Sequence, residues 1–490
     1  MVFLRQTPAG FRSQAAGVGV GRGGVAVPTL PLAIAAAAAA LGVVATVEPM
    51  LAVAAVVALA LVPVVLAHPI VGVVLLVFAS FLEEYAGMTG TLSVTKMLGA
   101  LLVVAWLAAV ATGSHGAQGR ALLAREPLLV AALVAFTAWA AISLAWAEAP
   151  NLAQTSVQRY ALNFMLFPIA LLALRAPRHM LWVIAAFVAG AFAAVLLGLN
   201  AGTLDDGRLA GAGINPNQLG SYLVVTIVFL TTLGAARLWS GPARTAALAG
   251  AALATVAVFL TLSRGALVGL AVALLIAPFA AGRGKRLGVS ALAVVAILAT
   301  VGWYGAVAPP DHVERVTNPD RDGGAGRTDL WRVGWRMVED KPVQGVGAGN
   351  YPVASIDYLL RPGATENDSQ IVDEQKVAHN IYLTVVSELG IVGLALFAVI
   401  VGLCLRSALR AARAFARRGE PAMELVSRAL FISLVSLLAV GFFSSALYVK
   451  QFWVLLAAAP ALHALAERDG RPTSGPREAA ARTARARAAG

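Results

Sequence analysis

The chain of 490 residues has few charged side chains and almost no cysteine. Charged residues make up 13% of it and hydrophobic residues 59%, with a mean hydropathy of +0.80. A soluble domain has about 25% charged and roughly 45–50% apolar residues, so this chain cannot cover a water-facing surface. A soluble globular protein is therefore excluded. The single cysteine, Cys404, excludes an internal disulfide and a cysteine-based metal cluster.

Acidic residues are scarce relative to basic ones. There are 25 Asp and Glu against 37 Lys and Arg, which leaves a net charge of +12. In a soluble chain this excess would suggest nucleic acid, but membrane proteins gather Lys and Arg in their cytoplasmic loops. We therefore expect a lipid bilayer and no nucleic acid as a partner.

Apolar runs long enough to cross a membrane repeat along the chain. A span needs about 20 apolar residues. Because β-barrel alternation is missing, we expect an all-α, polytopic transmembrane helical bundle. We predict about 12–14 spans, of which up to three lie in residues 30–82. The others are expected at about 95–112, 127–146, 159–174, 179–199, 217–236, 243–262, 266–281, 287–307, 381–405, 425–447 and 452–466.

Lys and Arg in alternate short loops predict the orientation. With fourteen spans these basic loops all face the cytoplasm, as do both termini. We expect residues 1–28 to be a disordered cytoplasmic arm, residues 29–466 the transmembrane domain, and residues 467–490 a basic, disordered cytoplasmic tail. The outward loops are then 83–94, 147–158, 200–216, 263–265, 308–380 and 448–451.

The loop 308–380 is the one large element outside the membrane, with 8 Lys and Arg and 12 Asp and Glu. Apolar residues at helical spacing predict an amphipathic helix from about Thr328 to Asp340, ended by Pro342. Trp331 and Trp335 share one face of it. The helix is expected either to lie at the membrane–water boundary or to pack on the outer ends of the spans.

The first outward polar cluster is GRLAGAGINPNQLGSY, residues 207–222. Asn215 can cap the next span, and Pro216 fits its first helical position because no backbone donor is needed there. A helix N-terminus attracts anions, and an arginine such as Arg208 supplies a fork for phosphate. The alternative is simple capping beside a solvated arginine.

The second cluster is TLSRGALVG, residues 261–269. Ser263 can cap the following helix, and Gly265 permits a tight turn. Arg264 is the only charge between residues 245 and 282, and an arginine so near the hydrocarbon is costly and therefore a functional candidate. The alternative is an arginine that snorkels and anchors the helix end.

The third cluster is AHNIYLTVVSELGIVGL, residues 378–394. His379 opens a span directly after the large loop, and a histidine can accept a proton from an attacking hydroxyl. Asn380 and Tyr382 add hydrogen-bonding groups. The alternative for the histidine is a cap or loop role. Together, two arginines and a histidine on one membrane face indicate a lipid phosphate ligand and transfer to a hydroxyl.

Other patterns carry less weight. Asp320-Arg321-Asp322 has the form of the metal and nucleotide-sugar motif of soluble glycosyltransferases, but it lies outside, where nucleotide sugars are not expected. Glycine at alternate positions of 345–349 mimics a phosphate loop without its strand–turn–helix context. Glu83 and Glu84 are candidate catalytic acids, although a solvated pair is the simpler interpretation. No carboxylates and histidines have metal-ligand spacing, so we expect neither a metal nor another cofactor.

At these clusters the sequence resembles the O-antigen ligase and O-antigen polymerase superfamily of bacterial membrane proteins. The order of the motifs and the large outer loop before the histidine-bearing span also match, over about residues 83–465. The matching segments are residues 207–222, LSRGALVGL (262–270), GRTDLWRVGWRMVEDKPVQGVGAGNY (326–351) and residues 378–394.

The resemblance implies a GT-C-like fold and a glycosyltransferase of the cytoplasmic (inner) membrane. Such proteins move a glycan from undecaprenyl pyrophosphate to a glycan, lipid or protein hydroxyl, without a metal and with inversion. Pyrophosphate-binding residues would map to Arg208 and Arg264, the catalytic residue to His379, and a loop contact to Arg327. Further candidates for substrate binding are Asn215, Asn217, Asn380 and Tyr382.

Three other functions stay open at this point. A repeat-unit polymerase would use the same donor and the same residues. A small-anion transporter would carry charges and broken helices in mid-membrane, whereas the distinctive charges of this chain lie at the outer ends of its spans. A non-catalytic scaffold for glycan assembly would not need Arg208 and Arg264.

Overall fold

A computed structural model describes residues 60–83, 93–112, 125–200, 204–205, 207–211, 213–235, 240–281, 286–290, 324–361 and 377–468, with isolated residues between 294 and 314. The expected arm 1–28, most of the span 287–307 and the motif at 320–322 lie outside these residues. The helices and strands labelled below all belong to one compact unit, residues 63–490.

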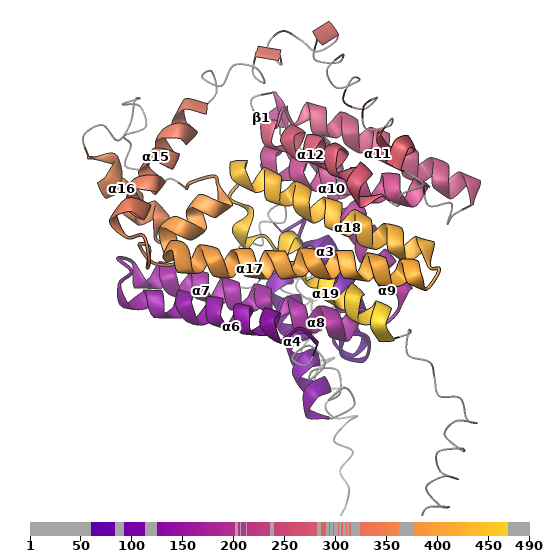
Figure 1. Cartoon of the computed structure of the whole chain (residues 1–490), viewed down its shortest axis with the longest axis horizontal. Helices are drawn as coiled ribbons and strands as arrows, with labels where there is room; N and C mark the ends of the chain where they lie inside the picture. The colour runs from indigo at the N-terminus through magenta and orange to yellow at the C-terminus, as the bar shows by residue number, and fades with distance from the viewer. Residues whose placement is uncertain are drawn as a thin grey trace, which may run out of the picture. The chain divides into compact units, whose positions relative to one another are not determined.

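The described chain is almost entirely helical, as predicted (Figure 1). The one sheet among the described residues is a two-stranded antiparallel hairpin in which Leu204 pairs with Leu209. The helices are α3 (Pro69–Ala79), α4 (Val94–Ala111), α6 (Pro127–Ile142), α7 (Pro150–Phe164), α8 (Leu166–Ala173), α9 (Pro177–Asn200), α10 (Pro216–Ala235), α11 (Gly241–Leu260), α12 (Arg264–Ala280), α15 (Gly324–Asp340), α16 (Tyr351–Leu359), α17 (Ile381–Arg417), α18 (Pro421–Val440) and α19 (Lys450–Arg468); the strands are β1 (Leu204–Asp205) and β2 (Arg208–Leu209); and the 3-10 turns are η1 (Ser143–Ala145), η4 (Gly441–Phe443) and η5 (Ala446–Tyr448).

Eight described helices are long and apolar enough to cross a membrane, and a bent pair, Ala60–Ala67 with Pro69–Ala79, would make a ninth. The all-α polytopic prediction is therefore confirmed. Many of these helices begin at proline, whose missing N–H costs nothing at a first helical position. The prolines concerned are Pro69, Pro127, Pro150, Pro177, Pro216 and Pro421.

Several predicted boundaries were wrong. The helix predicted at 381–405 continues to Arg417. Residues 147–158, expected to be an outward loop, are mostly helical, because Pro150 starts α7 within that polar stretch. The loop helix α15 begins at Gly324, four residues before the predicted Thr328. The last helix continues to Arg468, two residues into the expected tail, where Glu467 pairs with Arg125.

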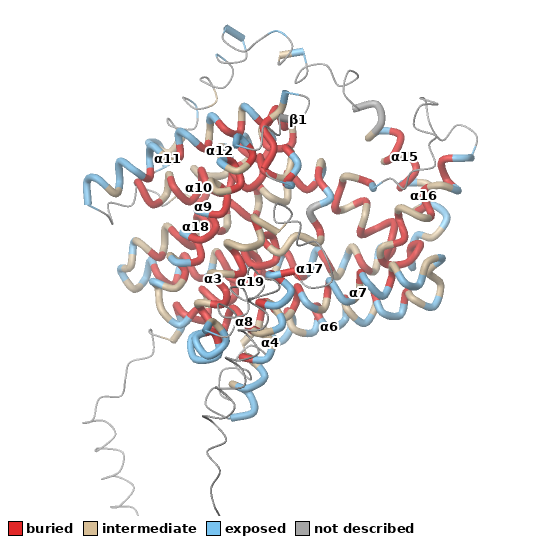
Figure 2. Tube along the Cα trace, turned by 180° about the vertical axis from the view of Figure 1, so that it is seen from behind, coloured by how far each residue is buried: buried red, intermediate tan, exposed pale blue. Residues whose placement is uncertain are grey.

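The helices α17, α18 and α19 form the centre of the packing. α17 packs against α6, α18 and α19, while α10 packs against α11, α12 and α18 (Figure 1). Burial follows this arrangement. α19 is buried along nearly its whole length, whereas α11 has a broad exposed face (Figure 2). An exposed apolar face such as that of α11 suits contact with lipid.

Candidate active site

The starts of α10 and α12 approach each other closely. Asn215 Oδ1 accepts a hydrogen bond from Gln218 N at 2.9 Å, and Ser263 Oγ accepts one from Ala266 N at 3.2 Å, so both predicted caps are present. Gly220 lies between these helix starts, and a Cβ added there would lie 2.7 Å from Ala266 Cβ. The glycine therefore allows the two positive helix ends to converge.

Arg208 joins these two helix starts. Its Nε donates to the carbonyl oxygen of Thr261 at 3.0 Å, and its Nη2 donates to Asn217 Oδ1 at 3.0 Å. The side chain comes from strand β2, where the neighbouring Leu209 is buried and anchors the hairpin. The guanidinium is half-buried and held on two sides, rather than a solvated loop group, so it is oriented before any ligand arrives.

Arg264, Arg327 and His379 form a second part of the same site. Burial lowers the pKa of the Arg327 guanidinium, and the nearby charge of Arg264 lowers it further. Burial also lowers the pKa of His379, and the charge of Arg327 adds to this effect. The positive side chain of Arg327 from α15 thus lies near the imidazole, and that of Arg264 from α12 lies near Arg327. Such a group of charges attracts an anion and favours the neutral form of the histidine.

The peptide that carries His379 is held by its neighbours. The Trp331 indole Nε1 donates to the carbonyl oxygen of Ala378 at 2.9 Å, and the Trp331 ring lies 6.2 Å from the ring of Phe443. Ser445 Oγ lies 3.4 Å from His379 Nδ1. Of the two tryptophans of the loop helix, Trp331 therefore packs on the protein, while Trp335 is 57% exposed.

Two site residues have unusual backbone angles. Leu262 and His379 both have φ of 48°, and they are the only non-glycine residues with positive φ in the described chain. Each one directly precedes the cap of a helix, Ser263 for α12 and Asn380 for α17. Residues other than glycine adopt this left-handed conformation at a cost, and such strain is concentrated at functional sites.

Several predicted substrate-binding groups are used inside the protein. Asn380 caps α17 by accepting from the N–H groups of Tyr382 and Leu383, so the span begins after Asn380 and not at His379. The Tyr382 hydroxyl donates to the carbonyl oxygen of Leu438 at 2.7 Å. Asn215 caps α10 in the same manner as Asn380 caps α17. These contacts are structural, whereas Asn217 holds Arg208 directly.

Glu83 is also used inside the protein. Its carboxylate accepts hydrogen bonds from Ser93 at 2.8 Å and from Thr95 at 2.5 Å, and it pairs with Lys450. Burial raises the pKa of Glu83, but the hydrogen bonds from Lys450 and Thr95 outweigh this and hold the pKa below its usual value. A carboxyl group that stays ionised is a poor general acid. Glu84 lies outside the described residues.

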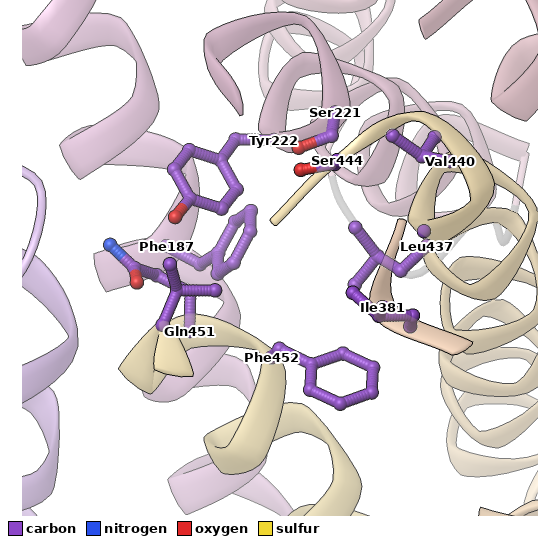
Figure 3. A pocket seen from close by; sticks show the side chains of 11 residues that line it. Phe187, Ser221, Tyr222, Ile381, Leu437, Val440, Ser444, Gln451 and Phe452 are labelled. Carbon is purple, nitrogen blue, oxygen red and sulfur yellow. The ribbon is translucent and has the colours of Figure 1, made fainter. Parts of the chain in front are cut away.

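A small cavity lies beside the site between α9, α10, α17, α18 and α19 (Figure 3). Aromatic rings of Phe187, Tyr222 and Phe452 line it, together with aliphatic side chains such as Ile381 at the start of α17. This mainly apolar lining does not suit a pyrophosphate. The polar groups that suit one lie at the helix starts described above.

Sequence reasoning missed the role of residues 441–451, which join α18 to α19 and include the first two residues of α19. Phe443 contacts Trp331, Ser445 contacts His379, Tyr448 contacts Glu388, and Lys450 pairs with Glu83. The segment has no unusual composition. The one signal for a role near the site was topological. The segment was expected to join the outward ends of two spans.

Comparison with protein families gives a match over residues 249–398 to the family described as O-antigen ligase. The matched region contains Arg264, Arg327 and His379, while Arg208 lies before it. The resemblance read from the motifs is therefore confirmed over this domain. No curated protein matches the chain.

Proposed function

We propose that this multi-pass membrane protein, with its O-antigen ligase family domain at residues 249–398, transfers a glycan from undecaprenyl pyrophosphate to an acceptor hydroxyl. The transfer takes place at the outer face of the cytoplasmic membrane and needs no metal. One observation carries the proposal: Arg208 joins the converging starts of α10 and α12, Arg264 at the start of α12 lies near Arg327, and Arg327 lies near His379.

In this reaction the arginines bind the group on which negative charge develops. The bond between the anomeric carbon and the pyrophosphate oxygen breaks, and its electron pair stays on the undecaprenyl pyrophosphate. Arg208 and Arg264 stabilise that charge at a boundary of low dielectric, where fixed donors are most effective. The Arg208 guanidinium is already oriented by Thr261 and Asn217, so little reorganisation is needed.

His379 acts on the acceptor. The acceptor oxygen forms the new bond to the anomeric carbon from the side opposite the pyrophosphate, which inverts the configuration. The acceptor proton passes to the imidazole, which must be neutral to accept it. A lowered His379 pKa favours that neutral form near pH 7. Such general-base assistance contributes about 10²–10⁴-fold in typical cases.

The transfer itself is tested with the purified protein in nanodiscs, a lipid-linked glycan donor and candidate acceptors. We expect His379→Ala to lose nearly all transfer. The matched control is His68→Ala, because His68 is exposed and makes no side-chain cap contact. Near-normal turnover of the His379 variant would remove this residue from the mechanism, and no transfer by the unmodified protein would contradict the function.

Ligase and polymerase are distinguished by the lipid-linked glycans of a deletion strain. A ligase passes finished chains to a different acceptor, so its loss leaves long chains on the carrier. A polymerase joins repeat units, so its loss leaves single units. Mass analysis of the carrier-linked glycans separates the two outcomes.

A further inference from the structure

Helix α17 is interrupted ten residues after its start. Gly390 has φ of 65° and ψ of −170°, so the helix is kinked there. A Cβ added to Gly390 would lie 2.0 Å from the carbonyl oxygen of Val343, in the outer loop. The loop backbone therefore lies directly against the helix at the break. A glycine is needed there for the positive φ of the helix and for the close approach of the loop.

The loop supplies the hydrogen bonds that the helix loses at the break. The N–H groups of Val346 and Gly347 donate to the carbonyl oxygens of Ser387 and Glu388 at 2.9 and 2.8 Å. In return the N–H of Ile391 donates to the carbonyl oxygen of Pro342 at 2.8 Å. The backbone groups freed by the kink are satisfied within the protein, unlike those of a transporter helix whose break lines a substrate site.

The Glu388 side chain completes this junction. Its carboxylate is 2% exposed and accepts from Gly349 N at 2.8 Å and from Tyr351 N at 3.3 Å. These donors belong to the start of α16. The cap residue of that helix, Asn350, uses its own side chain on Ala149 and Ala348 instead. Glu388 thus acts as the missing cap of α16, supplied by another helix.

Tyr351 transmits this contact to the helix that carries Arg327. Its hydroxyl donates to the carbonyl oxygen of Leu330 at 2.6 Å. A Cβ added to Gly334, on the same helix α15, would lie 3.0 Å from the Tyr351 ring, so the contact between ring and helix is tight. Leu330 follows Arg327 by one helical turn, and the next residue, Trp331, holds the peptide before His379.

We propose that Glu388 is a positioning residue for the transfer reaction: through Tyr351 and α15 it sets the place of Arg327 beside His379. The inference rests on the function proposed above. It also assigns a purpose to the glycines at 345, 347 and 349, which all have positive φ and lie against α17, the turn before α7 and α7 itself, respectively. They dock the loop and bind no phosphate.

Glu388→Gln tests the proposal. The amide oxygen keeps one acceptor, but the amide nitrogen then faces a backbone N–H, donor against donor. We expect faster hydrogen exchange of the amides in residues 341–360 and a fall of about 10²-fold in kcat/KM, the typical cost of a displacement of about 1 Å. The matched control is Glu420→Gln, in the turn between the far end of α17 and the start of α18, expected to change neither quantity.

A double-variant comparison separates positioning from general loss of structure. If Glu388 acts through Arg327, adding Glu388→Gln to Arg327→Ala should lower kcat/KM by less than about threefold further, because coupled sites are not additive. If the two losses multiply, the proposal is wrong. It is equally wrong if exchange rises in Glu388→Gln while transfer stays normal, or if exchange does not change.

Tyr351→Phe serves where Glu388→Gln does not fold, since it removes only the hydroxyl that contacts Leu330. We expect the same pattern with a smaller loss, and normal transfer would overturn the proposal. Failure of the underlying function is distinguishable, because the unmodified protein would then show no glycan transfer at all, while hydrogen exchange would still report whether Glu388 docks the loop.

Discussion

Arg327 lies close enough to His379 for its positive charge to lower the pKa of the imidazole, in addition to the effect of burial. The two residues come from different elements, α15 of the large loop between α12 and α17 and the peptide before α17. Arg264 has the same effect on Arg327. The loop therefore contributes charge to the site, and the protonation state of the histidine depends on where the loop sits.

This relationship predicts the pH dependence of transfer. In the proposed mechanism neutral His379 is the active form, so kcat/KM should rise with pH through an apparent pKa below the ordinary histidine value of 6.5. In Arg327→Gln the charge is gone, the pKa of His379 rises, and the acidic limb of the profile should move to higher pH. The control is Arg361→Gln, which removes an exposed loop charge paired with Asp340. The prediction is contradicted if the acidic limb of the kcat/KM profile lies at the same pH in Arg327→Gln as in the unmodified protein.

Arg208 should not be replaceable by lysine. Its guanidinium reaches Thr261 and Asn217 from two different nitrogens, and a lysine ammonium cannot reproduce this planar arrangement. We expect Arg208→Lys to lower kcat/KM by about 10²-fold, as loss of one transition-state donor commonly does. Asn217→Ala, which only frees the arginine, should cost about tenfold. Transfer assays with Arg244→Lys on the exposed end of α11 provide the control, and full activity of Arg208→Lys would argue against pyrophosphate binding there.

The sequence alone was sufficient for the parts of the fold that rest on local rules. Hydrophobic runs, proline at helix starts and the caps Asn215 and Ser263 depend on neighbouring residues, and the structure has them. The proximity of Arg264 and Arg327 was expected only from topology and resemblance, and the structure brings them together. The start of α7 was misjudged because most of its polar residues, such as Asn151, Gln154 and Gln158, are exposed, so this part of the helix has no continuous apolar run to mark it as a span.

Long-range contacts could not be predicted from the sequence. Glu388 was judged not to pair with His379, which is consistent with its contacts, but its partners Gly349, Tyr351 and Tyr448 are 37 to 60 residues away. The kink at Gly390 was also missed, since a glycine in an apolar helix has no distinguishing pattern unless the Val343 carbonyl beside it is known. Helix periodicity carries no information about such pairs.

The ion pair of Glu83 and Lys450 should stabilise the contacts of α19 with α3 and α4. Lys450→Met leaves a half-buried carboxylate without its cation. In Glu83→Gln the Lys450 ammonium remains, but it keeps its hydrogen bond to Thr95 Oγ1 and can donate to the new amide oxygen, so we expect a larger drop in the thermal midpoint for Lys450→Met. The lowered Glu83 pKa gives the sign of the pH effect. Its stabilisation is present above the ordinary value of 4.5 and is lost as pH falls through the lowered pKa. Melting curves at several pH values should show the gap between unmodified protein and Glu83→Gln closing on the acid side.

The glycine at the kink of α17 should be intolerant of even one added methyl group. In Gly390→Ala the new Cβ would lie 2.0 Å from the Val343 carbonyl oxygen, and the residue would also have to hold a φ of 65°. A left-handed non-glycine residue costs about 1–3 kcal/mol before any clash is counted. The atom in the way is the backbone carbonyl oxygen of Val343, which cannot rotate aside as a side chain could. The clash is therefore relieved only if the loop moves away from the helix.

Gly402 in the same helix provides the matched comparison, because nothing lies within 4 Å of a Cβ added there. We expect Gly402→Ala to keep or slightly raise the thermal midpoint, since alanine is the better helix former. Gly390→Ala should lower it by several degrees and speed amide exchange in the loop. Equal midpoints for the two variants would mean that the kink does not depend on the glycine, and that the junction of loop and helix is looser than the contacts of Val343 indicate.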